Sequence, residues 1–215
     1  RIGWLRNPTT GGVMATWGSY ADITAGEPGA LLGFLGPKVY EALHGEPFPP
    51  VQTAENLARV GVIDDVVALP GLRDWVSGIL SVANGRDQPE EVDDVLPPAG
   101  VDAWDAITVT RDEHRPGPDA VLDLLTDRTE LHGTGTGETG VGVRVLLGRL
   151  RGRRATFVAQ TRRDVTPQDL RVAQRGMRLA QRLGLPLVTL VDTPGGELSG
   201  PAEEAAMAGE IARTL

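Results

Sequence analysis

The chain has 215 residues, of which 40% are hydrophobic, and a formal net charge of −8. This length and hydrophobic fraction suffice for one large or two small domains, each with its own core. The absence of cysteine excludes disulfides and Cys-ligated zinc within the chain, the three scattered histidines predict no metal site, and the acidic balance argues against a general nucleic-acid-binding protein.

Membrane and targeting segments are also missing from the sequence pattern. No apolar run approaches the roughly 20 residues that a membrane-spanning helix needs, and no charged segment followed by an apolar one opens the chain. We therefore predict a cytoplasmic protein without a membrane partner. Because the chain opens with RIGWLR, a pattern typical of the middle of a strand, we also expect it to be part of a longer protein.

A glycine pair lies between the first expected strand, residues 2–5, and a helix expected over residues 13–20. Gly11 and Gly12 lack side chains, so a substrate can approach the main chain there. The first N–H groups of a helix can then stabilise the oxyanion of an enolate or of a tetrahedral intermediate. A plain strand-to-helix turn is the other meaning of such a pair, and the local sequence leaves both open.

Short strands and a helix follow. We expect strands at residues 21–25 and 30–34, separated by the turn GEPG, and a helix that starts at Pro37. Lys38 lies in the first turn of that helix, where a cation opposes the helix dipole. Either Lys38 binds a phosphate group of a ligand, or it is a solvated lysine that slightly lowers the stability of the helix.

The remainder of the first half predicts two more helices and a linker. Thr53 is typical of the N-cap of a short helix that Gly61 ends, and the strand IDDVV follows. A longer amphipathic helix is expected over residues 72–83. Residues 84–100 are rich in acidic residues and proline, which predicts an exposed linker.

In the second half, the run GTGTGETGVG predicts a flexible loop, because a strand and not a helix follows it. Residues 143–150 and 155–160 predict a hairpin. The helix with the strongest signals begins after Thr166 and ends at Gly184. The face predicted to be buried consists of Leu170, Ala173, Met177 and Ala180. The opposite face carries Arg171, Arg175, Arg178 and Arg182. These arginines form either a solvated basic face or a landing site for an acidic partner or for the phosphates of coenzyme A.

Residues 185–191 form a nearly continuous apolar run, which predicts a strand buried on both faces. The loop DTPGG, residues 192–196, follows it, and a further helix is expected from Pro201. Loops at the carboxyl ends of such strands are where α/β folds place their sites.

Several of these motifs together resemble a known family. NPTTGGV, ADITAGEPGALLGFLGPKVYEAL and AENLARVGVIDDVV, in this order, resemble the β half of bacterial acetyl-CoA carboxylase carboxyltransferase. AWDAITVTRDEHRPGPDAVLDLL, TELHG and LPLVTLVDTPGGELSGPAEEAAMAGEIA resemble its α half. The chain departs from the family pattern at Thr134-Gly135, at Gly196-Glu197 and at Ala205-Ala206.

The resemblance implies an α/β fold of two successive ClpP/crotonase-like ββα-superhelix units, each incomplete in this chain. Residues 1–85 would form the β-type unit, residues 86–100 the linker and residues 101–215 the α-type unit. The implied reaction transfers the carboxyl group of carboxybiotin to acetyl-CoA or another acyl-CoA, giving malonyl-CoA from acetyl-CoA. Biotin would be attached to a separate biotin carboxyl carrier protein, with a biotin carboxylase as a further partner, and none would be bound covalently. A homo-oligomer is expected, because in this family the active site forms between two copies.

The same resemblance implies site residues. Gly11 and Gly12 match the family's pair for the acyl-CoA carbonyl oxygen. The family's second pair, for biotin, and its zinc ribbon match no part of this chain. Residues matching the substrate-binding segments are Gly29, Ala30, Gly36, Lys38, Gly195 and Gly196. A decarboxylase subunit that acts on acyl-CoA or malonate, or a non-catalytic assembly subunit of the same fold, would have a similar pattern.

Overall fold

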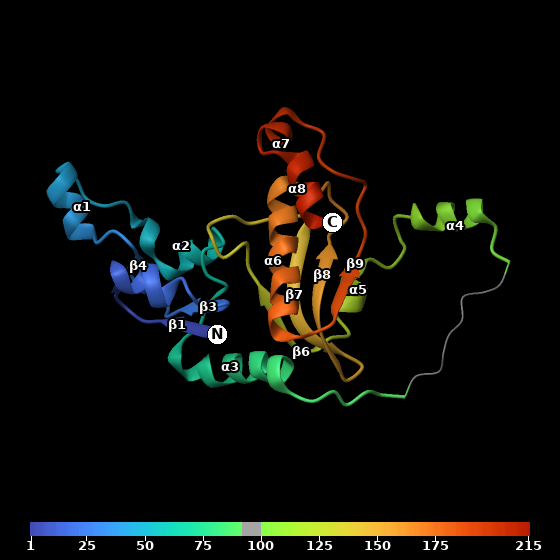
Figure 1. Ribbon diagram of the computed structural model, residues 1–215, viewed down its shortest axis with the longest axis horizontal. Coiled ribbons are helices and arrows are strands. Elements are labelled where there is room, and N and C mark those ends of the chain that lie inside the picture. The colour runs from blue at the N-terminus through green and yellow to red at the C-terminus, as the bar shows by residue number, and fades with distance from the viewer. Residues whose placement is uncertain (92–99) are drawn as a thin grey trace.

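Three sheets and the helices that cover them make up residues 1–91 and 100–215, the part of the chain that the computed structural model describes (Figure 1). The first sheet is parallel and has the order β1-β3-β5. Its strands are β1 (Ile2–Leu5), β3 (Ile23–Gly26) and β5 (Asp65–Val66). The second is a short parallel pair, β2 (Thr9–Thr10) and β4 (Leu32–Gly33). The largest has the order β6-β7-β8-β9 and consists of β6 (Thr126–Leu131), β7 (Val143–Leu150), β8 (Arg153–Gln160) and β9 (Leu187–Leu190).

The helices of the first half are a π-helical turn η1 (Met14–Gly18), α1 (Pro37–His44), a 3₁₀ turn η2 (Pro50–Gln52), α2 (Ala54–Arg59) and α3 (Leu69–Asn84). Those of the second half are α4 (Ala103–Thr110), α5 (Pro118–Leu122), α6 (Pro167–Leu183), α7 (Gly200–Glu204) and α8 (Met207–Thr214). Most predicted elements are therefore present. None of the described helices combines the length and the apolar character that crossing a membrane requires.

A small core holds the first two sheets to α2 and η1. It contains Leu5, Met14, Ala30, Leu32, Ala54 and Ile63. β3 is buried along its whole length and ends at Gly26, where an added Cβ would lie 2.8 Å from the Cβ of Ala54. Glycine therefore permits the close approach of β3 and α2.

The β7–β8 hairpin organises the second half, because it separates two apolar layers. Its turn has Arg151 and Gly152 at φ 48° and 72°, which is the geometry of a tight two-residue hairpin turn and confirms the predicted hairpin. Alternate residues point to opposite faces of the sheet. One face packs on α6 and α3 through a core that includes Val145, Leu147 and Val158. The other packs on α5 through Leu122, Leu146 and Phe157. Figure 1 shows α6 across β7 and β8, and α3 along the lower end of the sheet.

The limits of α6 are those that the sequence predicts. Thr166 and Asp169 form a capping box, with the Asp169 N–H donating to the Thr166 hydroxyl at 3.1 Å, and Gly184 ends the helix at φ 62°. The buried face is partly different from the predicted one: Val172, Ala173, Gly176, Leu179 and Ala180 are buried, whereas Leu170 and Met177 are only half-buried. The reason is that Gly176 lets the helix lie directly on Val145 and Val158.

The arginines of α6 are a correction to the predicted basic face, because three of the four bind carboxylates of this chain. Arg175 makes a two-pronged ion pair with Asp64, with Nη1 2.7 Å from Oδ1 and Nη2 2.9 Å from Oδ2. Arg182 pairs with Asp22, and Arg171 pairs with Glu138 and Glu210. Arg178 and Arg182 are both exposed, and of the four only Arg178 makes no ion pair with the described residues. The face therefore joins α6 to the first half of the chain and is largely unavailable to a partner.

The glycine-rich run is irregular but is held in place, which differs from the expected flexible loop. The Gly137 N–H donates to the Gly61 carbonyl at 3.2 Å, and the Thr134 N–H donates to the Glu138 carbonyl at 2.8 Å. An added Cβ on Gly133 would lie 2.5 Å from the Cα of Gly61. The run thus lets two backbones meet where the two halves of the chain join.

The linker prediction covers residues 86–100, of which 92–99 lie outside the described residues. Residues 86–91 are exposed but bind the hairpin turn: the Gln88 N–H donates to the Gly152 carbonyl at 3.0 Å, and Asp87 pairs with Arg154 at 2.9 Å. α3, which precedes this segment, packs on β6 and β7. The division into units 1–85 and 101–215 stays a prediction.

β9 is less buried than its apolar run indicates. Within the described residues it pairs only with β8, and the side chains of Leu187 and Val191 are exposed. The expectation of a strand buried on both faces is therefore wrong for this chain. An apolar run indicates that a strand can be buried, but it does not indicate which helices or strands cover it.

We expect Ala206→Gly to raise the free energy of unfolding by about 1 kcal/mol. Ala206 lies between α7 and α8 at φ 62° and ψ 47°, a left-handed conformation in which a Cβ is strained. Urea denaturation measures the change. Ala205→Gly is the matched control: because Ala205 has φ −85°, its replacement should destabilise the protein. Equal effects of the two substitutions would contradict strain at Ala206.

Candidate active site

The two glycines of the predicted oxyanion turn have different environments. Gly11 has φ 62°, and its N–H already donates to the carbonyls of Gly33 and Phe34, both at 3.0 Å. Gly12 is exposed, an added Cβ would meet no atom within 4 Å, and its N–H donates no hydrogen bond within the described part of the chain. The Gly11 N–H is therefore engaged within the turn, and the predicted oxyanion role of Gly11 stays a prediction. Gly12 presents the open amide.

The segment after Gly12 carries this amide on the first turn of a helix. The Thr16 hydroxyl donates to the Gly12 carbonyl at 2.6 Å, and the helix continues as the π-helical turn η1. The first N–H groups of a helix have no hydrogen-bond partner within the helix, and they form the positive end of its dipole. The local geometry therefore suits an anionic oxygen at Gly12.

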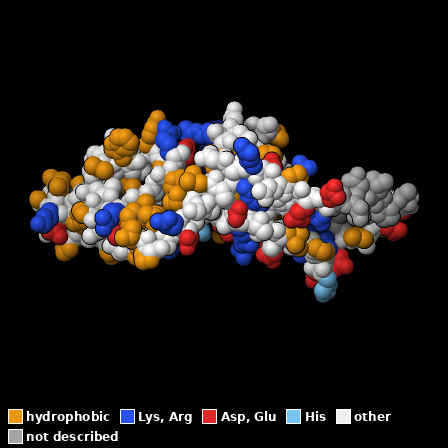
Figure 2. Space-filling view, turned by 90° about the horizontal axis from the view of Figure 1, so that it is seen from below, with side chains coloured by type: hydrophobic (Ala, Val, Ile, Leu, Met, Phe, Trp, Pro, Cys, Tyr) orange, Lys and Arg blue, Asp and Glu red, His pale blue; other side chains and the backbone are white. Residues whose placement is uncertain are grey.

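An apolar groove of about 640 Å³ lies beside this turn, between β1 and η1. Its walls include Trp4, Val13, Trp17 and Tyr20, and the Trp17 side chain is 81% exposed. Figure 2 shows hydrophobic side chains gathered over the half of the molecule that holds α1 and β1. Arg1 and Arg6 stand at the edges of the groove, over the rings of Tyr20 and Trp4.

The other residues predicted to bind substrate in the first half differ in exposure. The Gly29 N–H donates to the Glu55 carboxylate at 2.7 Å. Ala30 is fully buried and its main chain is hydrogen-bonded to Glu27 and Ala54, so its side chain belongs to the core; its predicted substrate-binding role stays a prediction. Gly36 precedes the first turn of α1.

Lys38 is exposed on the first turn of α1, and no carboxylate of the described residues pairs with it. The bonds from Gly11 to Gly33 and Phe34 bring the glycine turn next to the segment that leads into α1. Lys38 and Gly12 are therefore connected through a short stretch of chain, while α1 itself extends away from the sheets (Figure 1).

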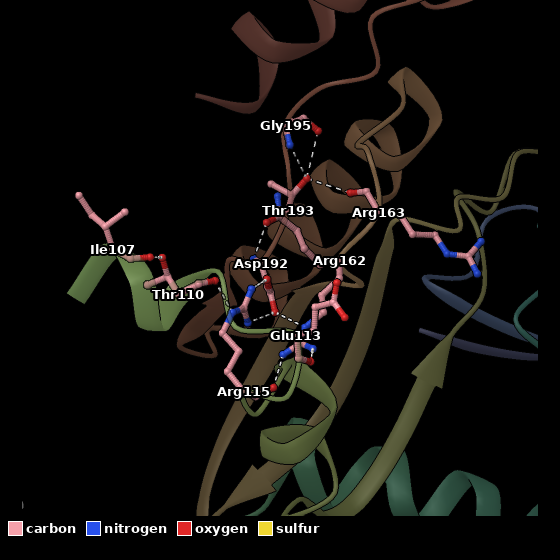
Figure 3. Close-up of polar contacts among 10 residues, drawn as sticks. Ile107, Thr110, Glu113, Arg115, Arg162, Arg163, Asp192, Thr193 and Gly195 are labelled. Carbon is pink, nitrogen blue, oxygen red and sulfur yellow. Dashed lines mark hydrogen bonds and ion pairs between the residues drawn. The ribbon is translucent and has the colours of Figure 1, made fainter. Parts of the chain in front are cut away.

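In the second half, the loop after β9 is held by a carboxylate between two arginines (Figure 3). Asp192 accepts hydrogen bonds from Arg115 Nη1 at 2.8 Å and from Arg162 Nε at 2.9 Å. The Arg115 hydrogen bonds lower the pKa of Asp192 to about 2, in spite of burial, which raises it. Asp192 is therefore ionised throughout the physiological pH range. It borders a cleft of about 800 Å³ that is also lined by Thr110, Arg111, Thr193 and Pro194.

Gly195 and Gly196, the predicted binding residues of this loop, are both partly committed to the fold. The Gly195 N–H donates to the Thr193 hydroxyl at 3.1 Å. An added Cβ on Gly196 would lie 2.5 Å from Cε of Met207. The Met207 side chain therefore packs against Gly196, and a larger residue at position 196 would require the flexible end of that side chain to move.

Sequence reasoning missed the Arg115–Asp192–Arg162 cluster. Arg115 belongs to the Arg-Pro pair of a family motif, which was a usable signal, and Asp192 belongs to another. Nothing in the local sequence marks Arg162, which adopts φ 62° and reaches back across the loop.

The two predicted parts of the site do not meet within one chain. The turn at Gly12 lies beside β2 and β4, and the loop at Gly195 follows β9, on the other side of α6 in Figure 1. Within the described residues, no group of three or more histidine and acidic side chains is arranged to hold a metal ion.

A family model described as acetyl co-enzyme A carboxylase carboxyltransferase-like matches residues 98–215, more than half of the chain. The chain belongs to this family. A relative from Mycobacterium tuberculosis, named a probable biotin-dependent acyl-coenzyme A carboxylase beta3 subunit, is 46% identical over 99% of the chain and 44% of its own length. One from Salinispora tropica, named acetyl-coenzyme A carboxylase carboxyl transferase subunits beta/alpha, is 35% identical over 98% of the chain and 42% of its own length.

Solved carboxyltransferase-family structures have the same fold. A single-chain, multi-domain long-chain acyl-CoA carboxylase superposes with a TM-score of 0.73 at 20% identity, over 99% of this chain and 22% of that one. Transcarboxylase 12S superposes with a TM-score of 0.69 at 18% identity, over 99% of this chain and 43% of that one. The expected α/β crotonase-like fold is thereby confirmed. The chain spans less than half the length of these carboxyltransferase relatives.

Proposed function

We propose that the protein transfers a carboxyl group from carboxybiotin to the α-carbon of an acyl-CoA, and that acetyl-CoA is its acceptor, giving malonyl-CoA. The observation that carries this proposal is the open amide of Gly12 at the start of a helix, beside an apolar groove. Membership of the carboxyltransferase family supports the reaction class. The names of the relatives support acyl-CoA as the acceptor and leave the acyl chain to experiment.

In this proposal the chain's own residues stabilise the enolate of the thioester. The Gly12 N–H donates to the oxygen on which negative charge develops when the α-carbon loses its proton. One preorganised donor of this kind contributes roughly 3 to 4 kcal/mol to transition-state stabilisation. No side-chain base is required of this chain, because carboxybiotin, when delivered to the site, would itself supply the base for the α-proton.

The loop after β9 is the proposed biotin-facing part of the site. Its exposed amide is that of Gly196, since the Gly195 amide is bonded to Thr193. The described residues of this loop hold no pair of open amides for the ureido oxygen of biotin, so we assign the loop no chemical step. Because Gly12 and Gly196 lie apart in one chain, we propose that a site with both is formed by two copies.

The proposed partners follow from the same reaction. A biotin carboxyl carrier protein would deliver carboxybiotin, and a biotin carboxylase would load it. Biotin is thus carried by a separate protein. The cytoplasmic location stays a prediction.

The test is carboxyl transfer by the full-length protein, with carboxylated biotin carrier and a series of acyl-CoAs of increasing chain length. We expect acetyl-CoA to have the highest kcat/KM. A higher kcat/KM for a longer acyl-CoA would overturn acetyl-CoA as the acceptor and keep the reaction class. Transfer of the carboxyl group from malonyl-CoA or malonate to biotin, followed by its loss from carboxybiotin as CO₂ and with no net forward transfer, would instead identify a decarboxylase.

A further inference from the structure

The loop after β9 has little apolar anchoring. Val191 and Leu198, at its two ends, are 77% and 98% exposed, and Pro194 is exposed as well. Loops that are not held by packing are mobile unless polar contacts fix them. The position of Gly195 and Gly196 therefore depends on hydrogen bonds.

Those hydrogen bonds converge on Asp192. Its N–H donates to Gln160 Oε1 at 2.8 Å, its carbonyl accepts from the Arg162 N–H at 2.9 Å, and its carboxylate accepts from Arg115 and Arg162. Every polar group of this residue is thus engaged. Asp192 ties together the end of β8, the segment before α5 and the loop itself.

Arg162 links the same three segments from the other side. Besides binding Asp192, its guanidinium donates to the carbonyls of Glu113 and Arg115. It does so from a left-handed backbone conformation, φ 62°, which is unfavourable for a residue with a side chain. Such strain persists only where the surroundings enforce it, and it is common at functional sites.

Beyond Asp192, the rest of the loop is bonded to the segment that leads into α6. The Val165 N–H donates to the Gly195 carbonyl, and the Glu197 N–H donates to the Val165 carbonyl, both at 2.9 Å. The Thr193 hydroxyl donates to the Arg163 carbonyl at 2.9 Å (Figure 3). These bonds fix the Gly196 amide only if Asp192 holds the start of the loop.

We propose that Asp192, clasped by Arg115 and Arg162, is a positioning residue that fixes the loop 193–196 for carboxyl transfer. This inference rests on the proposed function, which gives the loop its biotin-facing role. Asp192 acts through the main chain of the loop and does not itself touch the reacting atoms.

The test compares Asp192→Asn with Asp127→Asn in the full-length protein. Asp127 pairs with Arg149 at 2.9 Å in the same sheet, away from the cleft, so this control also removes one arginine–aspartate charge pair. The first measurement is hydrogen–deuterium exchange. We expect the Val165 and Glu197 amides to exchange roughly tenfold faster in Asp192→Asn and to be unchanged in Asp127→Asn. Equal exchange in both variants would overturn the positioning role.

The second measurement is carboxyl transfer by the same proteins. We expect Asp192→Asn to lower kcat at least tenfold with less than a twofold change in the KM for acyl-CoA, because the acyl-CoA is held at Gly12. Unchanged kcat in Asp192→Asn, with active wild type, would overturn the proposal. Faster amide exchange in Asp192→Asn together with an inactive wild type would show that Asp192 fixes the loop 193–196. It would also reject the proposed function, and with it the role of Asp192 in carboxyl transfer.

Discussion

Replacing Arg175 by methionine is expected to lower the free energy of unfolding by about 3 to 5 kcal/mol. Arg175 is the counter-ion of Asp64, which is only 2% exposed and also accepts hydrogen bonds from the amides of Thr24 and His132. Removing the guanidinium leaves a buried carboxylate without its positive partner, which is far more costly than losing an exposed ion pair. Urea denaturation at neutral pH measures the loss.

Two further variants separate this account from a general effect on α6. Arg178→Met changes an exposed arginine one turn away, so we expect a change within about 0.5 kcal/mol. The double variant Asp64→Asn, Arg175→Met should recover part of the loss, because the uncompensated charge is gone. A loss below about 1 kcal/mol for Arg175→Met would show that the joint between the two halves does not depend on this pair.

Gly12→Val is expected to lower carboxyl transfer to acyl-CoA by about 10²- to 10³-fold while stability is kept. An added Cβ at Gly12 meets no protein atom within 4 Å, so we expect the fold to accept a side chain at this position. It extends into the space from which a thioester oxygen would reach the Gly12 amide. The measurements are kcat/KM for acyl-CoA and the urea midpoint of the same preparation.

Gly71→Val is the matched control for this variant. Gly71 lies in the first turn of α3, and an added Cβ there also meets no atom within 4 Å. We expect Gly71→Val to keep full transfer activity. Full activity of Gly12→Val would remove the oxyanion role of this turn, whereas unfolding of Gly12→Val would mean that the turn is more confined than its geometry indicates.

Elements with local signals could be predicted from the sequence. The capping box of Thr166 and Asp169, the hairpin turn at Arg151-Gly152 and the helix stop at Gly184 each depend on a few neighbouring residues. Their physical causes are hydrogen bonds or backbone conformations within one turn, so the sequence contains the whole interaction.

Interactions between distant segments could not be predicted in this way. The α6 arginines read as a solvated face because Asp64, the partner of Arg175, is 111 residues away. Asp192 has partners 77 and 30 residues away, in Arg115 and Arg162. Such partners are known only once the fold brings them together.

The glycine positions illustrate the same limit at the candidate site. Both Gly11 and Gly12 fit an oxyanion turn by type, but the hydrogen bonds to Gly33 and Phe34 decide that only Gly12 is open. Gly196 departs from the family pattern by type, and only the fold shows that Cε of Met207 packs where an added Cβ at this position would lie. A residue's type shows that it could belong to a binding site. Its neighbours in the fold determine whether its N–H group is still free to bind a ligand.

The most direct test of the proposed carboxyltransferase is the reverse reaction of the full-length protein, with malonyl-CoA as donor and free biotin as acceptor. Transfer in this direction needs neither the carrier protein nor the biotin carboxylase, so it isolates the site that we assign to Gly12. We predict carboxybiotin and acetyl-CoA in equal amounts, formed at a rate that Gly12→Val lowers by about 10²- to 10³-fold. A folded protein that binds coenzyme A and yet forms no carboxybiotin would contradict the account and identify an assembly subunit of the same fold.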